Sequence, residues 1–413
     1  MTNPIPAIDA VEVETMIMTL GAIGAHSETG VWRTAFSDDW VAANAMVEDW
    51  ATAAGLTTRM DAAGNLWGRI EGSDGGKAIV SGSHIDSQCP GGRYDGALGV
   101  IAALVAIKTL VKTFGPPKRP LEMVSLCEEE GSRFPTAGFW GSRALVGRVS
   151  PTDPDTVKEA NGGTIGQAMQ AVGLDPARLD EAKRDDIAAF VELHIEQGPV
   201  LEHADIPVAV VTGITAIRHT EVTLTGEQNH AGAFPMDLRR DPMAGFAEVA
   251  SRLIDHAHRM GRPAVTTIGR CHVSPNAPAI IPRSVTFTVD ARHPIQDEAA
   301  RMHAAHAATL TEIAERRGLG LETLVLFDHP GSPSDPALIA ALEASAKRQG
   351  IPALHMASGA GHDAQQIARI CPVAMVFVRS EDGRSHTPEE FSTIDDIVAG
   401  IQVLAGALFE LAY

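Results

Sequence analysis

The chain has 413 residues, of which 45% are hydrophobic, and it carries a formal net charge of −19. This length is too great for one compact core and indicates two domains. The acidic balance, without a basic run, argues against nucleic acid and anionic membranes as partners. The N-terminal stretch MTNPIPAIDAVEVE has neither the positive start nor the apolar core of a signal peptide. The unpaired spacing of the four cysteines predicts free thiols in a reducing, cytoplasmic compartment; they are Cys89, Cys127, Cys271 and Cys371.

The first informative stretch follows an apolar run at 78–80, which predicts a short buried strand. Glycine-framed turns come next and carry His84, Asp86 and Asp95. The apolar run 97–111 then predicts a buried helix that begins at the same place. Strand ends and helix starts that converge on one point are where open α/β sheets bind ligands. Taken alone, His84 could still be a core histidine in a loop without chemistry.

A second stretch places three carboxylates at the end of an expected strand. The run 121–127 reads as the strand, and Glu128, Glu129 and Glu130 follow it. Adjacent carboxylates repel one another unless cations lie nearby. A solvated acidic turn is the alternative, but an apolar strand leading into the turn favours a cation site.

Two later stretches repeat this arrangement. His194 alternates with Leu193 and Ile195, which places it on the opposite face of an expected strand. His386 follows the apolar run 373–378. Each of the four stretches is an apolar strand followed by a histidine or a carboxylate. These side chains suit zinc and similar divalent ions, and two such ions can share a bridging carboxylate.

The character of the chain changes at about residue 210. Alternating polar and apolar residues predict strands at 220–226 and 284–290, and amphipathic helices are expected at 241–260 and 298–317. This pattern predicts a small α+β unit with one face of its sheet covered. A Pro-, Gly- and Ser-rich segment at 329–334 reads as the linker back to the first domain.

Seven motifs along the chain resemble the hydantoinase/carbamoylase branch of the M20 metallopeptidase superfamily. They are GSHIDSQ, GGRYDGALGV, EEEGSRF, ELHIEQGP, NHAGAFPMDLRRDP, SGAGHDA and RSHTPEE. Their order follows the family and covers nearly the whole chain, and His194 in LHIEQGP distinguishes this branch from the peptidases. The resemblance implies an α/β fold: a mixed-sheet catalytic domain, residues 1–209 and 329–413, with an inserted smaller α+β dimerisation or lid domain, residues 210–328.

The resemblance also implies a site for two divalent ions, with zinc favoured and manganese, cobalt or nickel as alternatives. The implied ligands are His84 and His194 on one ion, Glu130 and His386 on the other, and Asp95 as the bridge. Asp86 would orient the His84 ring. Glu129 would be the general base that takes a proton from the attacking water. Glu128 is left as a solvent-facing or supporting residue.

Three residues of the expected inserted domain resemble the family's substrate contacts. His230 would donate to the developing oxyanion, often across a dimer, although a lone histidine in such a turn is otherwise a surface residue. Asn276 and Arg292 would bind the substrate, and Arg292 could grip a carboxylate through two hydrogen bonds.

Outside that domain, three more residues resemble substrate contacts. Gln197 would help to bind the ureido group, and the glycine turn at Gly359 and Gly361 would meet the substrate carboxylate through its backbone.

The expected activity is metal-dependent hydrolysis of a linear, non-peptide C–N bond. The favoured substrate is an N-carbamoyl-L-amino acid, a small molecule with a carboxylate, cleaved to the amino acid, carbon dioxide and ammonia. Allantoate or a β-ureido acid is the runner-up, followed by an N-acyl amino acid. A non-catalytic dimeric relative is the alternative from another class. A homodimer through the lid domain is expected, with neither nucleic acid nor membrane as partner.

Overall fold

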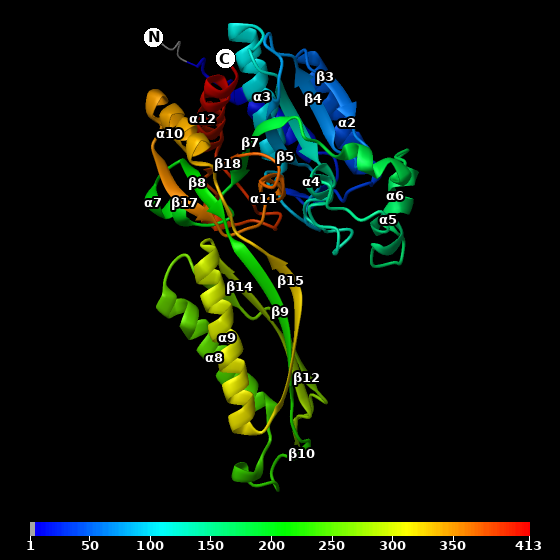
Figure 1. Ribbon diagram of the computed structural model, residues 1–413, viewed down its shortest axis with the longest axis vertical. Coiled ribbons are helices and arrows are strands. Elements are labelled where there is room, and N and C mark those ends of the chain that lie inside the picture. Colours follow the sequence, from blue (N-terminus) through cyan, green and yellow to red (C-terminus); the bar gives the residue numbers. More distant parts are fainter. Residues whose placement is uncertain (1–4) are drawn as a thin grey trace. The chain divides into compact units, whose positions relative to one another are not determined.

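The computed structural model describes residues 5–413. Residues 1–4 lie outside that range; they belong to the N-terminal stretch that was expected not to be a signal peptide. The described chain forms two compact units (Figure 1). The first contains the residues up to Thr212, then Ser334–Met356 and His362–Tyr413. The second contains Gly213–Pro333 and Ala357–Gly361.

The first unit is built on a mixed sheet. Its strands run in the order β8-β18-β7-β5-β6-β4-β3, and β17 pairs with β8. The central strands β18, β7, β5 and β6 are parallel, whereas β4, β3 and β8 join antiparallel. The bounds are β3 Thr57–Met60, β4 Leu66–Ile70, β5 Ala78–His84, β6 Leu121–Leu126, β7 Ile187–Ile195, β8 Val208–Ile214, β17 Ala353–Ser358 and β18 Val373–Val378. The sheet confirms the expected α/β class with a mixed sheet.

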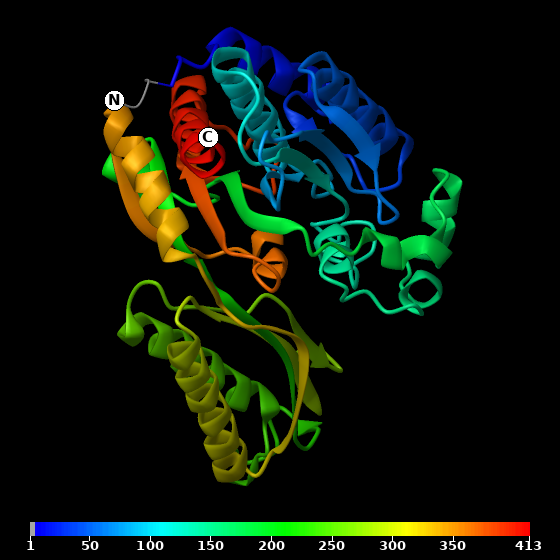
Figure 2. The ribbon, with the colours of Figure 1, turned by 45° about the horizontal axis from the view of Figure 1, so that its top comes forward.

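Long helices pack on this sheet and on one another (Figures 1 and 2). The helix α3, Ala97–Phe114, contacts β5, β6 and β7, and α12, Ile394–Ala412, lies between α3 and α10, Pro336–Gln349. Within residues 5–413, α3 alone is long and apolar enough to cross a membrane, but most of it is buried in the core. The other α-helices of this unit are α1 Ala10–Gly21, α2 Asp38–Ala53, α4 Trp140–Leu145, α5 Asp153–Thr156, α6 Ile165–Ala171, α7 Val200–Ala204 and α11 Asp363–Ile367.

The second unit has an antiparallel sheet in the order β11-β14-β9-β15, with β12 also paired to β14. Side chains of β14 alternate between buried and half-buried, as expected for a strand with one covered face. The helices α8, Pro242–Met260, and α9, Gln296–Arg317, cover that face. The strand bounds are β9 Ala216–Thr225, β10 Asn229–His230, β11 Val265–Thr267, β12 Cys271–Ser274, β13 Ile280–Ile281, β14 Ser284–His293, β15 Gly320–His329 and β16 Ser332–Pro333.

The second unit has more strands than the two that the sequence pattern predicted. The strand β15 was missed because its apolar residues Leu324, Val325 and Leu326 are consecutive and all exposed, which breaks the alternation used to recognise strands. The four cysteines are free thiols, as expected.

Candidate metal centre

Four neighbouring parallel strands deliver the candidate ligands to one edge of the first unit's sheet. His84 is the last residue of β5, and His194 lies near the end of β7. Glu130 follows β6, and His386 follows β18. Parallel strands place their carboxyl ends at the same edge, so residues far apart in sequence meet there.

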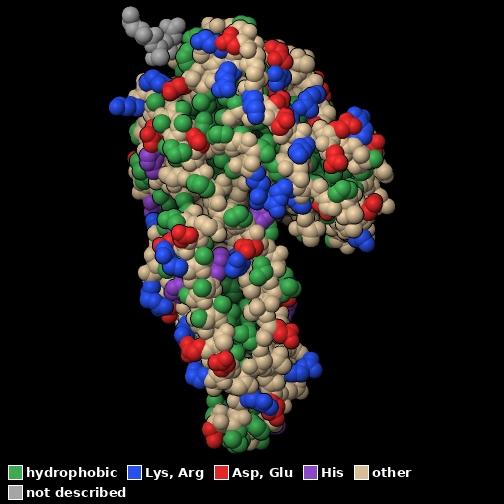
Figure 3. Space-filling model, in the orientation of Figure 1, with side chains coloured by type: hydrophobic (Ala, Val, Ile, Leu, Met, Phe, Trp, Pro, Cys, Tyr) green, Lys and Arg blue, Asp and Glu red, His purple; other side chains and the backbone are tan. Residues whose placement is uncertain are grey.

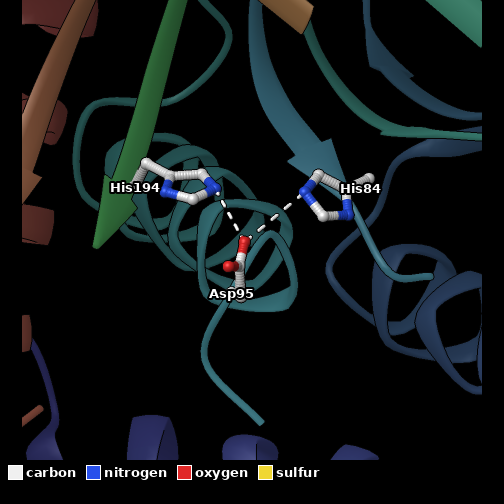
Figure 4. Close-up of side chains that lie close together, drawn as sticks. All are labelled: His84, Asp95 and His194. Atoms are coloured by element: carbon white, nitrogen blue, oxygen red, sulfur yellow. Dashed lines mark ion pairs between the residues drawn. The ribbon is translucent and has the colours of Figure 1, made fainter. Parts of the chain in front are cut away.

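Asp95 lies between two buried imidazoles (Figure 4). Its Oδ1 is 3.1 Å from Nε2 of His194 and 3.7 Å from Nε2 of His84. The backbone of Gly96 makes room for this contact, because a Cβ there would lie 2.3 Å from the His84 ring. Donor atoms bound to one zinc ion at about 2.0–2.2 Å lie roughly 3.4 Å apart at tetrahedral angles. The three side chains therefore fit around one ion.

The other oxygen of Asp95 faces a second group of ligands. Asp95 Oδ2 is 3.4 Å from Nε2 of His386, which is 3.8 Å from Oε2 of Glu130. The donor atoms of Asp95, Glu130 and His386 lie within 4.8 Å of one another, as do those of His84, Asp95 and His194. One carboxylate thus offers an oxygen to each group, which is the arrangement a bridging ligand requires. The residues fit a pair of divalent ions, and some of their ligand atoms also accept hydrogen bonds from the protein: Nε2 of His194 from the Gly96 N–H at 3.3 Å, and Oε2 of Glu130 from Gln88 at 2.7 Å.

Burial and mutual repulsion dominate the electrostatics of the acidic residues. Burial, followed by the charge of Asp95, raises the pKa of Glu130 to about 8. Burial and the adjacent Glu130 raise the pKa of Glu129 well above its usual value. Burial lowers the pKa of His194, but Asp95 outweighs it and raises that pKa to about 9. Without cations, this edge of the sheet therefore holds protons near neutral pH.

Metal binding should release those protons. We expect on the order of two protons to leave per chain at pH 7, because ligands bind metal in their deprotonated forms. In the metal-free protein, a carboxylate with a raised pKa contributes stability that is lost as pH rises through the folded value, about 8 for Glu130. The gain in melting temperature on adding zinc should consequently be larger at pH 8 than at pH 6. Calorimetric titration with metal in two buffers of different ionisation enthalpy counts the protons released. A count near zero would contradict the expected release of protons.

Glu129 lies beside the ligands. Its side chain is 9% exposed, and Oε2 is 3.6 Å from Nε2 of His84. The positive φ of Glu128 and of Gly131 bends the chain around it. A carboxylate in this position is within reach of a water molecule held at the ligand groups, as a proton acceptor must be.

Asp86 contacts His84 and also supports the acidic segment. Its carboxylate accepts hydrogen bonds from the backbone N–H groups of Glu129, at 3.3 Å, and Glu130, at 3.1 Å. Nδ1 of His84 lies closer to the backbone oxygen of Asp86, at 3.0 Å, than to Oδ1, at 3.8 Å. Asp86 therefore holds the His84 ring through its backbone and the acidic segment through its side chain.

Glu128 is not solvent-facing, which corrects one of the two roles left open for it. The residue is fully buried, and Oε1 accepts the backbone N–H of Phe134 at 2.8 Å. It supports the turn that carries Glu129 and Glu130.

Sequence reasoning did not single out two residues that fix Asp95. Oε1 of Glu390 accepts the backbone N–H groups of Tyr94, at 3.0 Å, and Asp95, at 2.9 Å. Ser385 donates from Oγ to Oδ2 of Asp95 at 2.8 Å. A Cβ on Gly92 would lie 2.2 Å from Oε1 of Glu390, so glycine is required there. Both residues stand inside RSHTPEE, and that motif was the available signal.

Glu192, the first residue of ELHIEQGP, is a third residue that sequence reasoning did not single out. It accepts hydrogen bonds from Oγ of Ser83, at 2.7 Å, and the backbone N–H of Ala364, at 3.2 Å. With His194 and His362 it forms a further buried group with ligand spacing, which shares His194 with the first group.

Gln197 also contacts the ligands. It has a positive φ, and Nε2 donates to Oδ2 of Asp95 at 2.7 Å. The side-chain amide therefore lies at the second ligand group, where it could also meet a substrate carbonyl or ureido group.

The remaining candidates lie in the second unit. His230 is exposed on β10, and its Nδ1 accepts the N–H groups of Gly232 and Ala233 at 3.0 Å each. A neutral His230 therefore carries its hydrogen on Nε2 and can donate from it. Asn276 is exposed and has a positive φ in the turn after β12.

Arg292 is held by two partners within the second unit. Asp290 accepts from Nε, at 3.0 Å, and Nη2, at 2.7 Å, so one edge of the guanidinium is already occupied. Nη1 donates to the backbone oxygen of Gly359 at 2.8 Å. Arg292 and the Gly359–Gly361 turn thus meet, and a carboxylate could approach only the free end of the guanidinium.

The chain is similar to known proteins over nearly its whole length, both in sequence and in structure. The model of Peptidase family M20/M25/M40 matches residues 80–410. An allantoate amidohydrolase from Bacillus subtilis is 38% identical over 395 residues, which is 95% of this chain and 96% of the relative. An N-carbamoyl-L-amino acid amidohydrolase from Geobacillus stearothermophilus is 40% identical over 402 residues, 96% and 97% of the two chains. The solved structure of a hydantoinase/carbamoylase family amidase from Burkholderia multivorans superposes with a TM-score of 0.91, at 37% identity and 98% coverage of both chains.

Proposed function

Because the chain belongs to Peptidase family M20/M25/M40, we propose that it hydrolyses a ureido C–N bond of a small carboxylate, with an N-carbamoyl-L-amino acid as substrate. The chain is an amidohydrolase of C–N bonds other than peptide bonds. The observation that carries the proposal is the Asp95 carboxylate, which faces one ligand group with each oxygen and has Glu129 beside it.

The proposed ion sites follow the ligand groups. His84 and His194 would hold one ion, Glu130 and His386 the other, and Asp95 would bridge them. Zinc is the favoured metal, with manganese, cobalt and nickel as alternatives. When bound, the ions supply Lewis acidity that polarises the ureido carbonyl and acidifies water.

The chain's own residues would carry the proton and hold the substrate. Glu129 takes a proton from the attacking water, the oxygen adds to the ureido carbon, and Glu129 returns the proton to the leaving nitrogen as the C–N bond breaks. His230 donates from Nε2 to the developing oxyanion. Carbamate breakdown then gives carbon dioxide and ammonia.

The remaining candidates would position the substrate. Gln197 and Asn276 bind its polar groups. The free end of Arg292 and the backbone at Gly359 and Gly361 hold its carboxylate. Asp290 limits Arg292 to one open edge, which favours a single carboxylate in a fixed orientation.

Allantoate is the second candidate, since relatives that are allantoate amidohydrolases match over nearly the whole chain. A β-ureido acid and an N-acyl amino acid follow. We further propose a cytoplasmic homodimer that associates through the second unit, as expected for this branch, without nucleic acid or membrane partners.

A substrate panel tests the proposal. Zinc- or manganese-loaded protein should release ammonia from N-carbamoyl-L-amino acids faster than from allantoate or β-ureidopropionate. Cleavage of N-acetyl amino acids is measured in the same panel by detecting the amine. The matched D-enantiomers serve as the control and should give no ammonia. Faster turnover of allantoate would move the assignment to the second candidate, and deacylation alone would contradict a ureido substrate.

A further inference from the structure

A buried arginine lies beside the segment that carries His84. Figure 3 shows lysine and arginine side chains spread over the visible surface of the protein. Arg33 is instead only 2% exposed. Burial lowers its pKa to about 10, against the opposing charge of Asp86, so the guanidinium is charged at pH 7. A charge in the core is costly unless polar groups pair with it, which makes the partners of this arginine informative.

The side chain of Arg33 has two separate sets of partners. Nε donates at 2.7 Å to the backbone oxygen of Ile85, the residue that directly follows His84. Nη1 donates to the backbone oxygens of Leu20, at 3.0 Å, and Ile23, at 2.8 Å, near the end of α1. The first contact acts on the ligand segment, and the second joins that segment to the helix.

The backbone around Arg33 is bound to the loop that follows the ligand segment. The Arg33 N–H donates to Oγ of Ser87 at 3.0 Å, and the Arg33 oxygen accepts the Ser87 N–H at 2.9 Å. Two residues earlier, Val31 exchanges two backbone hydrogen bonds with Gly91, at 2.9 and 2.8 Å. The arginine is therefore fixed at its backbone and at its guanidinium, and the Nε contact between them has one geometry.

The contact with Ile85 is linked to the orientation of the His84 ring. The Ile85 oxygen and the Asp86 nitrogen belong to one planar peptide unit, so a bond that holds this oxygen orients the chain at Asp86. The backbone oxygen of Asp86 accepts from Nδ1 of His84 at 3.0 Å. A neutral histidine that donates from Nδ1 has Nε2 free to bind a metal ion. Nε2 of His84 is the atom that faces Asp95, at 3.7 Å.

We propose that Arg33 is a positioning residue of the metal centre. Its Nε–H holds the Ile85 carbonyl, which orients the Asp86 peptide and through it turns the His84 ring toward the ion that it would hold. This role rests on the ligand groups of the proposed function but is independent of the substrate. Loss of a contact that orients a ligand histidine weakens metal affinity by about 10–100-fold, and Arg33 acts through one further peptide, so about tenfold is expected.

Two substitutions separate the two sets of contacts. Arg33→Lys keeps the charge, and its Nζ can reach the oxygens of Leu20 and Ile23. It has a carbon atom in place of Nε and therefore loses the bond to Ile85. Arg33→Gln does the reverse, because its Nε2 takes the place of the arginine Nε while its side chain is too short to reach the end of α1.

Zinc titration of the full-length protein against a competing chelator measures the affinity for each ion. His84→Ala identifies the ion in question by the binding constant that it loses. Arg33→Lys should weaken binding of that ion about tenfold and leave the other within about threefold of wild type. Arg33→Gln should keep both constants within about threefold. Melting temperatures of the metal-free proteins should show the opposite order, with Arg33→Gln the less stable variant.

Unchanged zinc affinity in Arg33→Lys, or an equal loss in both variants, would overturn the proposal. If Arg33→Lys does not fold, Arg33→Gln decides, because about tenfold weaker binding in a variant that keeps the Ile85 donor contradicts the positioning role. Failure of both variants to fold would show that Arg33 stabilises the core instead, which also contradicts it. Binding of fewer than two zinc ions by the wild-type protein would contradict the ligand assignment itself, and is thereby distinguished from a failure of Arg33 alone.

Discussion

Glu129→Gln should keep its metal and lower kcat by about 10³-fold, with little change in KM. Glutamine has the same shape and can still accept a hydrogen bond, but it cannot take a proton. Glu129 is buried beside His84, with its backbone N–H held by Asp86, so the substitution leaves the surrounding geometry in place. Steady-state kinetics with metal analysis of the same sample measures both quantities.

Glu128→Gln is the matched control for this substitution. It changes the neighbouring buried carboxylate, whose bond from the Phe134 N–H an amide oxygen can also accept. Its kcat should stay within about tenfold of wild type, since no proton transfer is assigned to it. A Glu129→Gln enzyme as active as this control would remove Glu129 as the base.

Asp95→Asn should lose at least one of its two ions and lower kcat by about 10³-fold or more. Burial would raise the pKa of Asp95, but His194, His386 and His84 hold it well below its usual value, so Asp95 is charged among imidazoles. An amide offers one acceptor oxygen and no charge to two ligand groups. Metal content after dialysis and kcat of the same preparation check this result.

Glu390→Gln distinguishes the role of Asp95 as a metal ligand from the role of Glu390 as a residue that holds Asp95 in place. Glu390 does not belong to either ligand group but accepts the N–H of Asp95 at 2.9 Å. Loss of such a supporting contact weakens metal affinity by about 10–100-fold, so this variant should bind both ions when metal is in excess. Asp95→Asn should not recover under the same excess. Full recovery of Asp95→Asn would contradict the bridging assignment.

Much of the first unit could be predicted from local pattern. The apolar run 373–378 is the strand β18, and the run that begins at Ala97 is α3. The motifs named the residues that the structure places around Asp95, because these ligands lie at the end of an apolar strand or in the turn that follows one.

Contacts between distant segments could not be predicted in this way. Glu390 lies 295 residues from Asp95, and no periodicity relates the two. The side chain of Asp86 was expected at His84, and its Oδ1 does lie 3.8 Å from Nδ1 of that ring. Its hydrogen bonds to the Glu129 and Glu130 backbone could not be predicted, because they depend on the fold of the turn.

The boundaries of the second unit show the same limit. The pattern suggested residues 210–328, whereas the compact unit comprises Gly213–Pro333 and the short return segment Ala357–Gly361. That segment contributes through a backbone oxygen at Gly359, which leaves no signature in the side chains.

Metal content and ammonia release from one sample test the central assignment most directly. The protein would be stripped with a chelator, reloaded with increasing zinc or manganese, and assayed with an N-carbamoyl-L-amino acid at each step. The five ligands predict no turnover after stripping, and full activity only as the second ion per chain is bound. Full turnover by the stripped protein, or saturation of activity at one ion per chain, would contradict the two-ion site.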